Sequence, residues 1–304
     1  MLIGSAAVAL AGSALGSAPA LALGNSGVSL RWLGVAGWEL LFDGRRVLID
    51  PYLSRLPVLN ADGTIIADYQ LRVRTELVNR HLVDQPELIL ATHGHYDHLL
   101  EIPYLMRKFA GKPRVIGTET HAHLLAAQGV PTDRMIVAEG GEYLDFHGFT
   151  VQVVRSLHSQ FGSYGYFAPG TLTAKPKPPK TISDLVEGGT LGYLITIGDR
   201  YSVLFLSGTA NFVEREVTGL RPDALVLGLS GHANIYDYTA RVLRATQPKL
   251  LIPSHHDDMV TQLDDPALPE KGFPKAAQEL TDTAKRLGLP ATVLDPSILR
   301  WNDL

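Results

Sequence analysis

The sequence contains no cysteine among its 304 residues. This absence excludes disulfide bonds, and it leaves histidine, aspartate and glutamate as the side chains that would hold a metal ion. It does not decide the cellular compartment, because many exported bacterial proteins also lack disulfides.

The sequence also has little excess charge. The formal net charge is −4 at pH 7, which gives no electrostatic basis for binding nucleic acid. Hydrophobic residues make up 45% of the chain, which is enough for a substantial core in one large α/β domain. No internal repeat at solenoid spacing is present. These features predict a globular protein that has no nucleic acid as a partner.

Residues 1–22 have the features of an export signal whose start is truncated. They carry no charge and end in Ala20-Leu21-Ala22, a small-residue cleavage pattern. The positive residues that usually precede such a segment are missing, which a start codon assigned too far downstream would explain. A buried or membrane-anchoring helix is the alternative, although Pro19 and several Gly and Ser residues oppose a packed helix.

We therefore expect an exported protein with a single domain over residues 23–304. After signal removal no stable membrane association is expected. A cytoplasmic location remains the alternative, and the oligomeric state is left open.

Residues 88–98 are the stretch around which the chain is organised. An apolar run from Leu88 to Thr92 has the length and composition of a strand buried on both faces. Four metal-competent side chains follow directly, namely His93, His95, Asp97 and His98. Burying them is costly without a partner, and a divalent cation binds both neutral imidazole and carboxylate. The stretch predicts a metal site, with Gly94 allowing a tight turn between the first two histidines.

The pattern H-x-H-x-D-H of these residues resembles the signature of the metallo-β-lactamase superfamily. The resemblance implies an α/β fold, the four-layer αββα sandwich of that superfamily. It covers most of the chain, from Val28 to the last predicted strand, and is nearest to the ascorbate-6-phosphate lactonase type. Members of that group often carry a histidine just after the first glycine, where this chain has Val35.

Hydrophobic alternation and turn residues predict the elements between the motifs. Strands are expected over residues 28–33, 38–42, 46–49, 88–92, 114–117, 134–138, 142–146, 150–155, 190–197, 201–206, 224–227, 250–252 and 292–294. Those over 134–138, 142–146 and 150–155 are expected to be antiparallel. Helices are expected within 71–82, over 99–109, after Thr118 as N-cap, and over 236–246 and 274–287. The helix within 71–82 is expected to cover the site.

Three other histidines and one basic loop are predicted to lie outside the site. His121 and His123 fall on different faces of the predicted helix and are expected to be solvated. His147 belongs to a turn. The stretch 175–180, Lys-Pro-Lys-Pro-Pro-Lys, is expected to be a solvated surface loop, with a lid that meets an anionic substrate as the alternative.

The resemblance implies two groups of metal ligands. His93, His95 and His158 are expected to hold metal 1, and Asp97, His98 and His255 are expected to hold metal 2. His158 and His255 each follow a predicted strand, and His256 is the alternative to His255. The expected metal is zinc, as one or two ions, with manganese and iron as alternatives.

The sequence departs from the superfamily pattern after the strand 201–206. Members usually carry Gly-Asp there, and that aspartate bridges two metals, whereas this chain has Thr209. A threonine hydroxyl is a poor ligand for a divalent cation, so the second metal should bind more weakly than the first. His232 is a candidate replacement ligand or acid-base group, with a structural histidine as the alternative.

The predicted activity is that of a metal-dependent hydrolase. A metal-activated water would attack a small ester, lactone or phosphoester substrate, with Asp97 as base and His232 as acid. Thr209 keeps open a second hypothesis, a non-catalytic metal- or ligand-binding protein on the same fold. A redox protein with an iron pair is less expected, because oxygen-reducing members often carry a glutamate where His95 stands.

Overall fold

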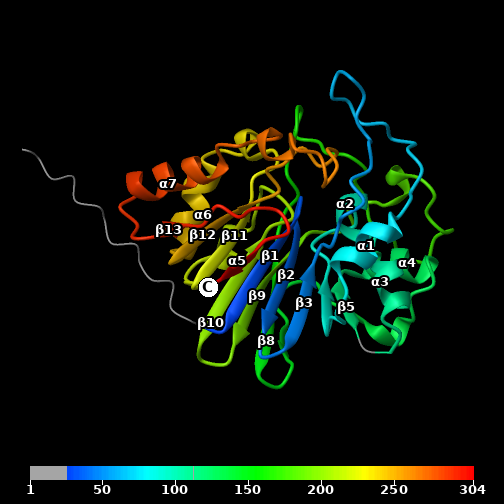
Figure 1. Cartoon of the computed structure of the whole chain (residues 1–304), viewed down its shortest axis with the longest axis horizontal. Helices are drawn as coiled ribbons and strands as arrows, with labels where there is room; N and C mark the ends of the chain where they lie inside the picture. The colour runs from blue at the N-terminus through cyan, green and yellow to red at the C-terminus, as the bar shows by residue number, and fades with distance from the viewer. Residues whose placement is uncertain (1–25, 112) are drawn as a thin grey trace, which may run out of the picture.

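The computed structural model describes residues 26–111 and 113–304, and its architecture confirms the predicted αββα sandwich. Two seven-stranded sheets form the centre of the molecule, and helices cover both outer sides (Figure 1). The predicted export signal over residues 1–22 lies outside the described residues and stays a prediction. Within the described ranges, no helix is long and apolar enough to cross a membrane.

The first sheet has the strand order β14-β1-β2-β3-β4-β5-β6. In this order the strands are Trp301–Asp303, Val28–Gly34, Gly37–Phe42, Arg45–Ile49, Leu88–Leu90, Arg114–Gly117 and Met135–Val137. The first four pair antiparallel, and β3 to β6 run parallel. The expectation that residues 134–138 are antiparallel to the next two strands is wrong. The chain crosses over through a helix before β6, and such a crossover returns a strand parallel to β5.

The second sheet has the order β13-β12-β11-β10-β9-β8-β7. In this order its strands are Thr292–Val293, Leu250–Ser254, Ala224–Gly228, Tyr201–Leu206, Leu191–Ile197, Phe149–Arg155 and Tyr143–Asp145. The strands β7 to β10 pair antiparallel, and β10 to β13 run parallel. All the strands of this sheet were predicted to within a few residues.

The helices pack on the outer faces of the sheets. The first sheet is covered by α1 (Thr75–His81), α2 (Tyr96–Leu99), α3 (Ile102–Lys108) and α4 (Glu119–Ala127). The second is covered by α5 (Glu214–Val217), α6 (Tyr238–Thr246) and α7 (Ala276–Arg286). Four single turns of 3-10 helix complete the structure, at Thr132–Arg134, Ile182–Asp184, His232–Asn234 and Leu268–Glu270.

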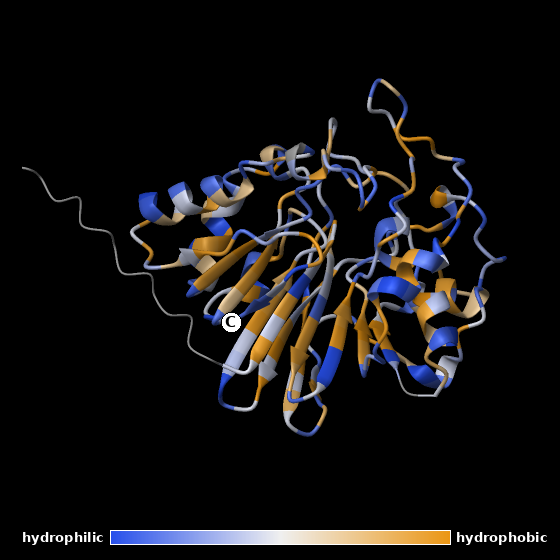
Figure 2. Ribbon diagram, viewed as in Figure 1, coloured by the Kyte–Doolittle hydropathy of each residue, from blue (hydrophilic) through white to orange (hydrophobic). Residues whose placement is uncertain are grey.

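The strands are apolar on both faces because each sheet is covered twice. In β9, Tyr193 and Ile195 enter the core between the sheets, whereas Leu194 packs under the helices of the second sheet. In β4, Leu88 and Leu90 face the central core and Ile89 faces the outer helices. Figure 2 shows the result, with hydrophobic residues concentrated along the strands and hydrophilic ones on the outer helices. This double burial explains the continuous apolar runs in the sequence.

One buried tyrosine joins the two sheets just below the metal-binding stretch. The Tyr193 hydroxyl on β9 donates a hydrogen bond to the carbonyl oxygen of Ala91, at 2.6 Å. Ala91 lies directly after β4 and before His93. The side chain of Tyr193 is fully buried, so this bond fixes the end of β4 relative to the second sheet.

Tyr193→Phe should lower the free energy of unfolding by about 1–2 kcal/mol, because it removes this buried hydrogen bond and leaves no water to replace it. Urea denaturation measures the change. Tyr143→Phe, at a mostly exposed tyrosine of β7, is the matched control and should change the free energy by less than about 0.5 kcal/mol. An equal effect of both variants would contradict the role of Tyr193.

Candidate metal centre

The candidate site lies where strands of both sheets end. His93 and His95 lie in the loop that follows β4 of the first sheet, and Asp97 and His98 lie in α2, which begins directly after that loop. His158 follows β8 and His255 follows β12, both of the second sheet. The structure brings these six side chains together in two groups of three, and within each group the possible ligand atoms all lie within 4.8 Å of one another.

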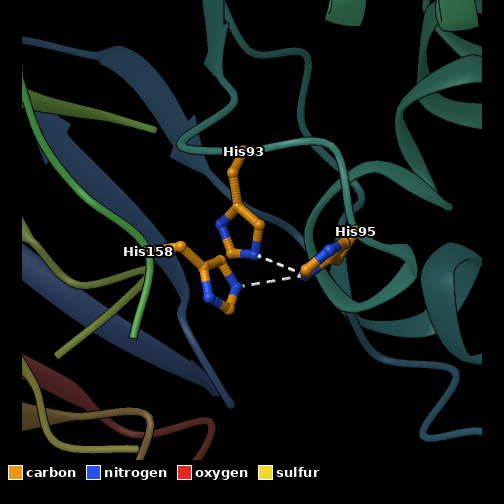
Figure 3. A group of neighbouring side chains, drawn as sticks. All are labelled: His93, His95 and His158. Carbon is orange, nitrogen blue, oxygen red and sulfur yellow. Dashed lines mark hydrogen bonds between the residues drawn. The ribbon is translucent and has the colours of Figure 1, made fainter. Parts of the chain in front are cut away.

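The first group consists of His93, His95 and His158, whose rings point toward one another (Figure 3). The Nδ1 atom of His95 lies 3.1 Å from Nε2 of His93 and 3.2 Å from Nε2 of His158. Three ring nitrogens therefore converge on one small volume. This is the arrangement that a tetrahedral cation with one open position requires.

In His95 and His158 the other ring nitrogen has a carbonyl partner. His95 Nε2 lies 3.3 Å from the carbonyl oxygen of Ala168, and His158 Nδ1 lies 2.7 Å from that of Ser159. A carbonyl oxygen only accepts, so the ring proton sits on these nitrogens and the converging ones carry lone pairs. Burial lowers the pKa of His95 to about 4 and that of His158 to about 3. Both are therefore neutral at pH 7, as metal binding requires.

The second group consists of Asp97, His98 and His255. The Oδ2 atom of Asp97 lies 3.1 Å from His98 Nε2 and 3.3 Å from His255 Nε2. His98 Nε2 is buried and has no hydrogen-bond partner among the described residues. A buried nitrogen of this kind is costly unless a ligand satisfies it, and a cation between the three atoms would do so. The donor set therefore fits a second divalent ion.

Asp50 orients His98 from behind. Its carboxylate lies 2.8 Å from His98 Nδ1 and accepts hydrogen bonds from the backbone N–H of Thr92, at 2.7 Å, and from the Thr92 hydroxyl. Burial alone would lower the pKa of His98, but Asp97 and Asp50 outweigh it and raise the pKa to about 10. Asp50 follows β3 directly, beside β4, and from this position it supports His98.

His255, and not His256, reaches the second group. Its backbone N–H donates to the carbonyl oxygen of Val35, at 2.9 Å, and its φ of 49° is in the left-handed region. Such a backbone is strained for histidine and persists only where surrounding contacts hold it. The ring of His256 instead stacks on Trp32, with 4.5 Å between ring centroids.

The segment after β10 does not supply a bridging ligand. The hydroxyl of Thr209 donates to the carbonyl oxygen of Leu157, at 2.8 Å, and so does not face the two groups. Gly208 lines the cavity above them instead, and a Cβ added there would lie 2.0 Å from the Thr92 hydroxyl. A carboxylate at position 208 therefore has no room. No described carboxylate other than Asp97 belongs to either group.

Instead, this segment holds the loop that carries His158. The Nδ2 atom of Asn211 donates to the carbonyl oxygen of His158, at 3.1 Å. The Thr209 hydroxyl donates to the carbonyl oxygen of Leu157, the residue before His158. The backbone N–H of Ala210 donates to the Ser159 hydroxyl, at 2.7 Å. Three successive residues thus fix the position of one ligand.

The structure does not bring His232 to the other six residues. Its Nε2 lies 2.9 Å from a carboxylate oxygen of Glu279 on α7, and its Nδ1 lies 2.6 Å from the carbonyl oxygen of Leu229. The hydrogen bond to Glu279 raises the pKa of His232. With both nitrogens engaged, His232 is not available as a replacement ligand, and it does not line the cavity at the metal groups.

The expectation of a solvated His121 is wrong. The residue is fully buried, and its Nδ1 accepts from the backbone N–H of Thr118, at 3.0 Å, in the capping box of α4. Its Nε2 lies 3.2 Å from the carbonyl oxygen of Glu187, and burial lowers its pKa to about 4. The pattern of the helix did not reveal that the loop around Glu187 folds over it.

Gly94 is required for close approach rather than for a tight turn. Its backbone N–H donates to the carbonyl oxygen of Glu187, at 2.8 Å, and a Cβ would lie 2.1 Å from the carbonyl oxygen of Val186.

Of the other features expected to lie outside the site, the turn residue His147 and the lysines of 175–180 are exposed, as predicted.

A family model described as a beta-lactamase superfamily domain matches residues 45–256 of the chain. The chain belongs to this superfamily. A protein of Sulfurisphaera tokodaii named UPF0173 metal-dependent hydrolase is 26% identical over 233 residues, which cover 75% of this chain and 84% of the relative. A protein of the same name from Roseiflexus sp. is 22% identical over 272 residues, which cover 88% of this chain and 93% of that relative.

Solved structures show the same fold. Igni18, described as a metallo hydrolase from Ignicoccus hospitalis, superposes with a TM-score of 0.56 at 16% identity, over 91% of this chain and 99% of its own. CmlA, a diiron β-hydroxylase from Streptomyces venezuelae, superposes with a TM-score of 0.55 at 17% identity. The match covers 91% of this chain and 54% of the CmlA chain. The predicted superfamily, fold and metal-dependent hydrolase class are confirmed.

Asp50→Asn should weaken metal binding about 10- to 100-fold, the usual effect of removing a carboxylate that orients a metal-binding histidine. A competition titration of the metal-loaded protein with a chromophoric chelator measures the affinity. Asp43→Asn is the matched control, because Asp43 forms an exposed ion pair with Arg200 far from the ligands in the fold. Unchanged affinity in Asp50→Asn would remove the supporting role of this residue.

His232→Gln should leave the hydrolysis rate within about threefold of the wild type and lower the free energy of unfolding by about 0.5–1 kcal/mol, the range of partly exposed ion pairs. Because the folded-state pKa of His232 is raised, this stabilisation is present at pH 6 and is lost as the pH rises through that pKa. Urea denaturation at pH 6 and pH 9 tests the sign. A hundredfold loss of rate would return His232 to the catalytic machinery.

Proposed function

We propose that the chain hydrolyses a small ester, lactone or phosphoester with zinc ions held by the two groups of ligands. His93, His95 and His158 would hold one ion, and Asp97, His98 and His255 the other. The observation that carries the proposal is the convergence of six side chains, five of them buried and His158 half-buried, with the proton of His95 and of His158 placed on the outer nitrogen. Such an arrangement suits a cation, and the buried Nε2 of His98 has no hydrogen-bond partner among the described residues.

The ions supply the chemistry that these side chains lack. When bound, a divalent cation lowers the pKa of a coordinated water toward neutrality and polarises the scissile carbonyl or phosphoryl oxygen.

Asp97 is the residue that moves the proton. Its Oδ2 lies between His98 and His255, which leaves Oδ1 to accept a proton from the attacking water. Burial alone would raise the pKa of Asp97, but the neighbouring imidazoles of His98 and His255 hold it well below its usual range. The carboxylate is therefore ionised at pH 7.

The bond changes follow from this placement. The water oxygen adds to the carbonyl carbon, the bond to the leaving-group oxygen breaks, and the proton held by Asp97 passes to that oxygen. No other described residue of the two groups has an oxygen in this position.

The absence of a bridging carboxylate favours two ions of unequal affinity. The first group presents three neutral nitrogens, whereas His98 in the second group is paired with Asp97 and Asp50. A proton on His98 must leave before that nitrogen can bind a metal. The second ion should therefore bind more weakly. The relatives named as hydrolases favour an enzyme over a non-catalytic binding protein.

Asp97→Asn should lower kcat for ester hydrolysis by about 10²- to 10⁴-fold, the usual contribution of a positioned base. Because Asp97 is also a ligand, elemental analysis of the same sample must show whether at least one zinc ion per chain is retained. Asp133→Asn, at an exposed aspartate, is the matched control. A variant with zinc bound and a rate within threefold of the wild type would contradict the role of Asp97.

A further inference from the structure

From the cavity above the ligands we infer that the substrate is a neutral carboxylic ester or lactone with an apolar body, and not a phosphoester or another anion. This inference rests on the proposed function, because it concerns the substrate of the same site. The chemistry of the cavity wall favours the ester and the lactone over the phosphoester among the three proposed substrate classes.

The cavity has a volume of about 630 Å³, which is sufficient for a small organic molecule. All six proposed ligands lie at its base. The remaining wall is mainly aromatic and aliphatic, and its large apolar side chains are Ile65, Tyr96, Phe161, Tyr166, Phe167 and Met259. Ser159, Ser230 and four glycines are the other members of the wall, so the ligands supply the only titratable groups besides the two tyrosines.

The aromatic side of the wall is positioned against the first ligand group. The ring of Tyr166 stacks on that of His158, with 4.3 Å between centroids, and the ring of Phe167 lies 5.7 Å from that of His95. An apolar group bound beside the ligands would therefore contact these rings. Burial of such a group is favourable, whereas a charged group would lose its hydration without gaining a partner there.

Phe161 forms the outer end of this wall. Residues 161–165 close a short hairpin in which Phe161 and Gly165 exchange backbone hydrogen bonds of 2.8 and 3.2 Å. The ring packs on Gly231, where a Cβ would lie 2.8 Å away, yet 45% of the residue remains exposed. Phe161 is therefore held in place and contributes apolar surface to the lining of the cavity.

No lysine or arginine lines this cavity, all of whose wall residues belong to the described part of the chain. The buried guanidinium of Arg55 is bound to Asp257, at 2.6 Å, and to Asp258, at 3.1 Å. Arg155 lines a different cavity, on the other side of His158 and Tyr166. An anionic substrate would therefore have only the metal ions to balance its charge, and sites built for phosphate usually add arginine or lysine.

The test compares p-nitrophenyl hexanoate with mono-p-nitrophenyl adipate, an ester of the same chain length that ends in a carboxylate remote from the scissile bond. The zinc-loaded full chain is assayed with both esters, with p-nitrophenyl acetate and with bis(p-nitrophenyl) phosphate, each corrected for its rate with hydroxide alone. We expect kcat/KM for the hexanoate to exceed that for the adipate and that for the acetate by about tenfold or more, since each buried methylene contributes a factor of about four.

Variants of Phe161 test whether the apolar cavity wall causes the preference for the hexanoate. Phe161→Ala should raise KM for the hexanoate about tenfold with kcat within about twofold, because the ring contributes apolar contact and no ligand or proton-transferring group, and Phe161→Leu should restore most of the affinity. Tyr143→Ala removes an exposed aromatic side chain of β7 outside the cavity and should leave both constants unchanged.

Two results would overturn the inference. One is a kcat/KM for the adipate or the phosphodiester equal to or above that for the hexanoate. The other is a Phe161→Ala variant that keeps the wild-type preference. Absence of turnover on all four substrates, with zinc bound in stoichiometric amount, would instead contradict the proposed function itself.

Discussion

The convergence of six side chains that could hold metal ions, five of them buried, at the common edge of two sheets is the constraint on which this structure depends. In the first group, Nδ1 of His95 lies 3.1 Å from Nε2 of His93 and 3.2 Å from Nε2 of His158, and lone pairs at such distances repel unless a cation lies between them. The sandwich produces this situation because β4, β8 and β12 end near one another with continuous apolar runs behind them. The apolar core fixes where the strands end, and the strand ends fix where the ligands converge.

A second layer of hydrogen bonds determines which atom each ligand presents. In three of the histidines, the ring nitrogen that faces away from the metal position has its own hydrogen-bond partner. The partners are Asp50 for His98, the Ala168 carbonyl for His95 and the Ser159 carbonyl for His158. Thr209 and Asn211 fix the loop of His158, so the segment that in relatives of the metallo-β-lactamase superfamily usually supplies a bridging aspartate here supports another ligand. Without a bridging carboxylate, this segment adds no charge to the cavity wall, to which it contributes Gly208.

Most of the fold and the grouping of the six proposed ligands could be predicted from the sequence, because both depend on local signals. Apolar segments joined by the turn Gly198-Asp199 located β9 and β10, and the motif from His93 to His98 located the site. The short edge strand β14 was not predicted, since Trp301–Asp303 has too few residues for a pattern. The burial of His121 and the pairing of His232 with Glu279 depend on residues 66 and 47 positions away. The periodicity of one element carries no information about such contacts.

The most direct test of this account is anomalous diffraction at the zinc edge from crystals of the zinc-loaded protein. The account predicts one peak among His93, His95 and His158 and a second, of equal or lower occupancy, among Asp97, His98 and His255. Peaks at neither position, in crystals that show the side chains arranged as described, would contradict it. The convergence of six ligands would then have to be explained without a metal.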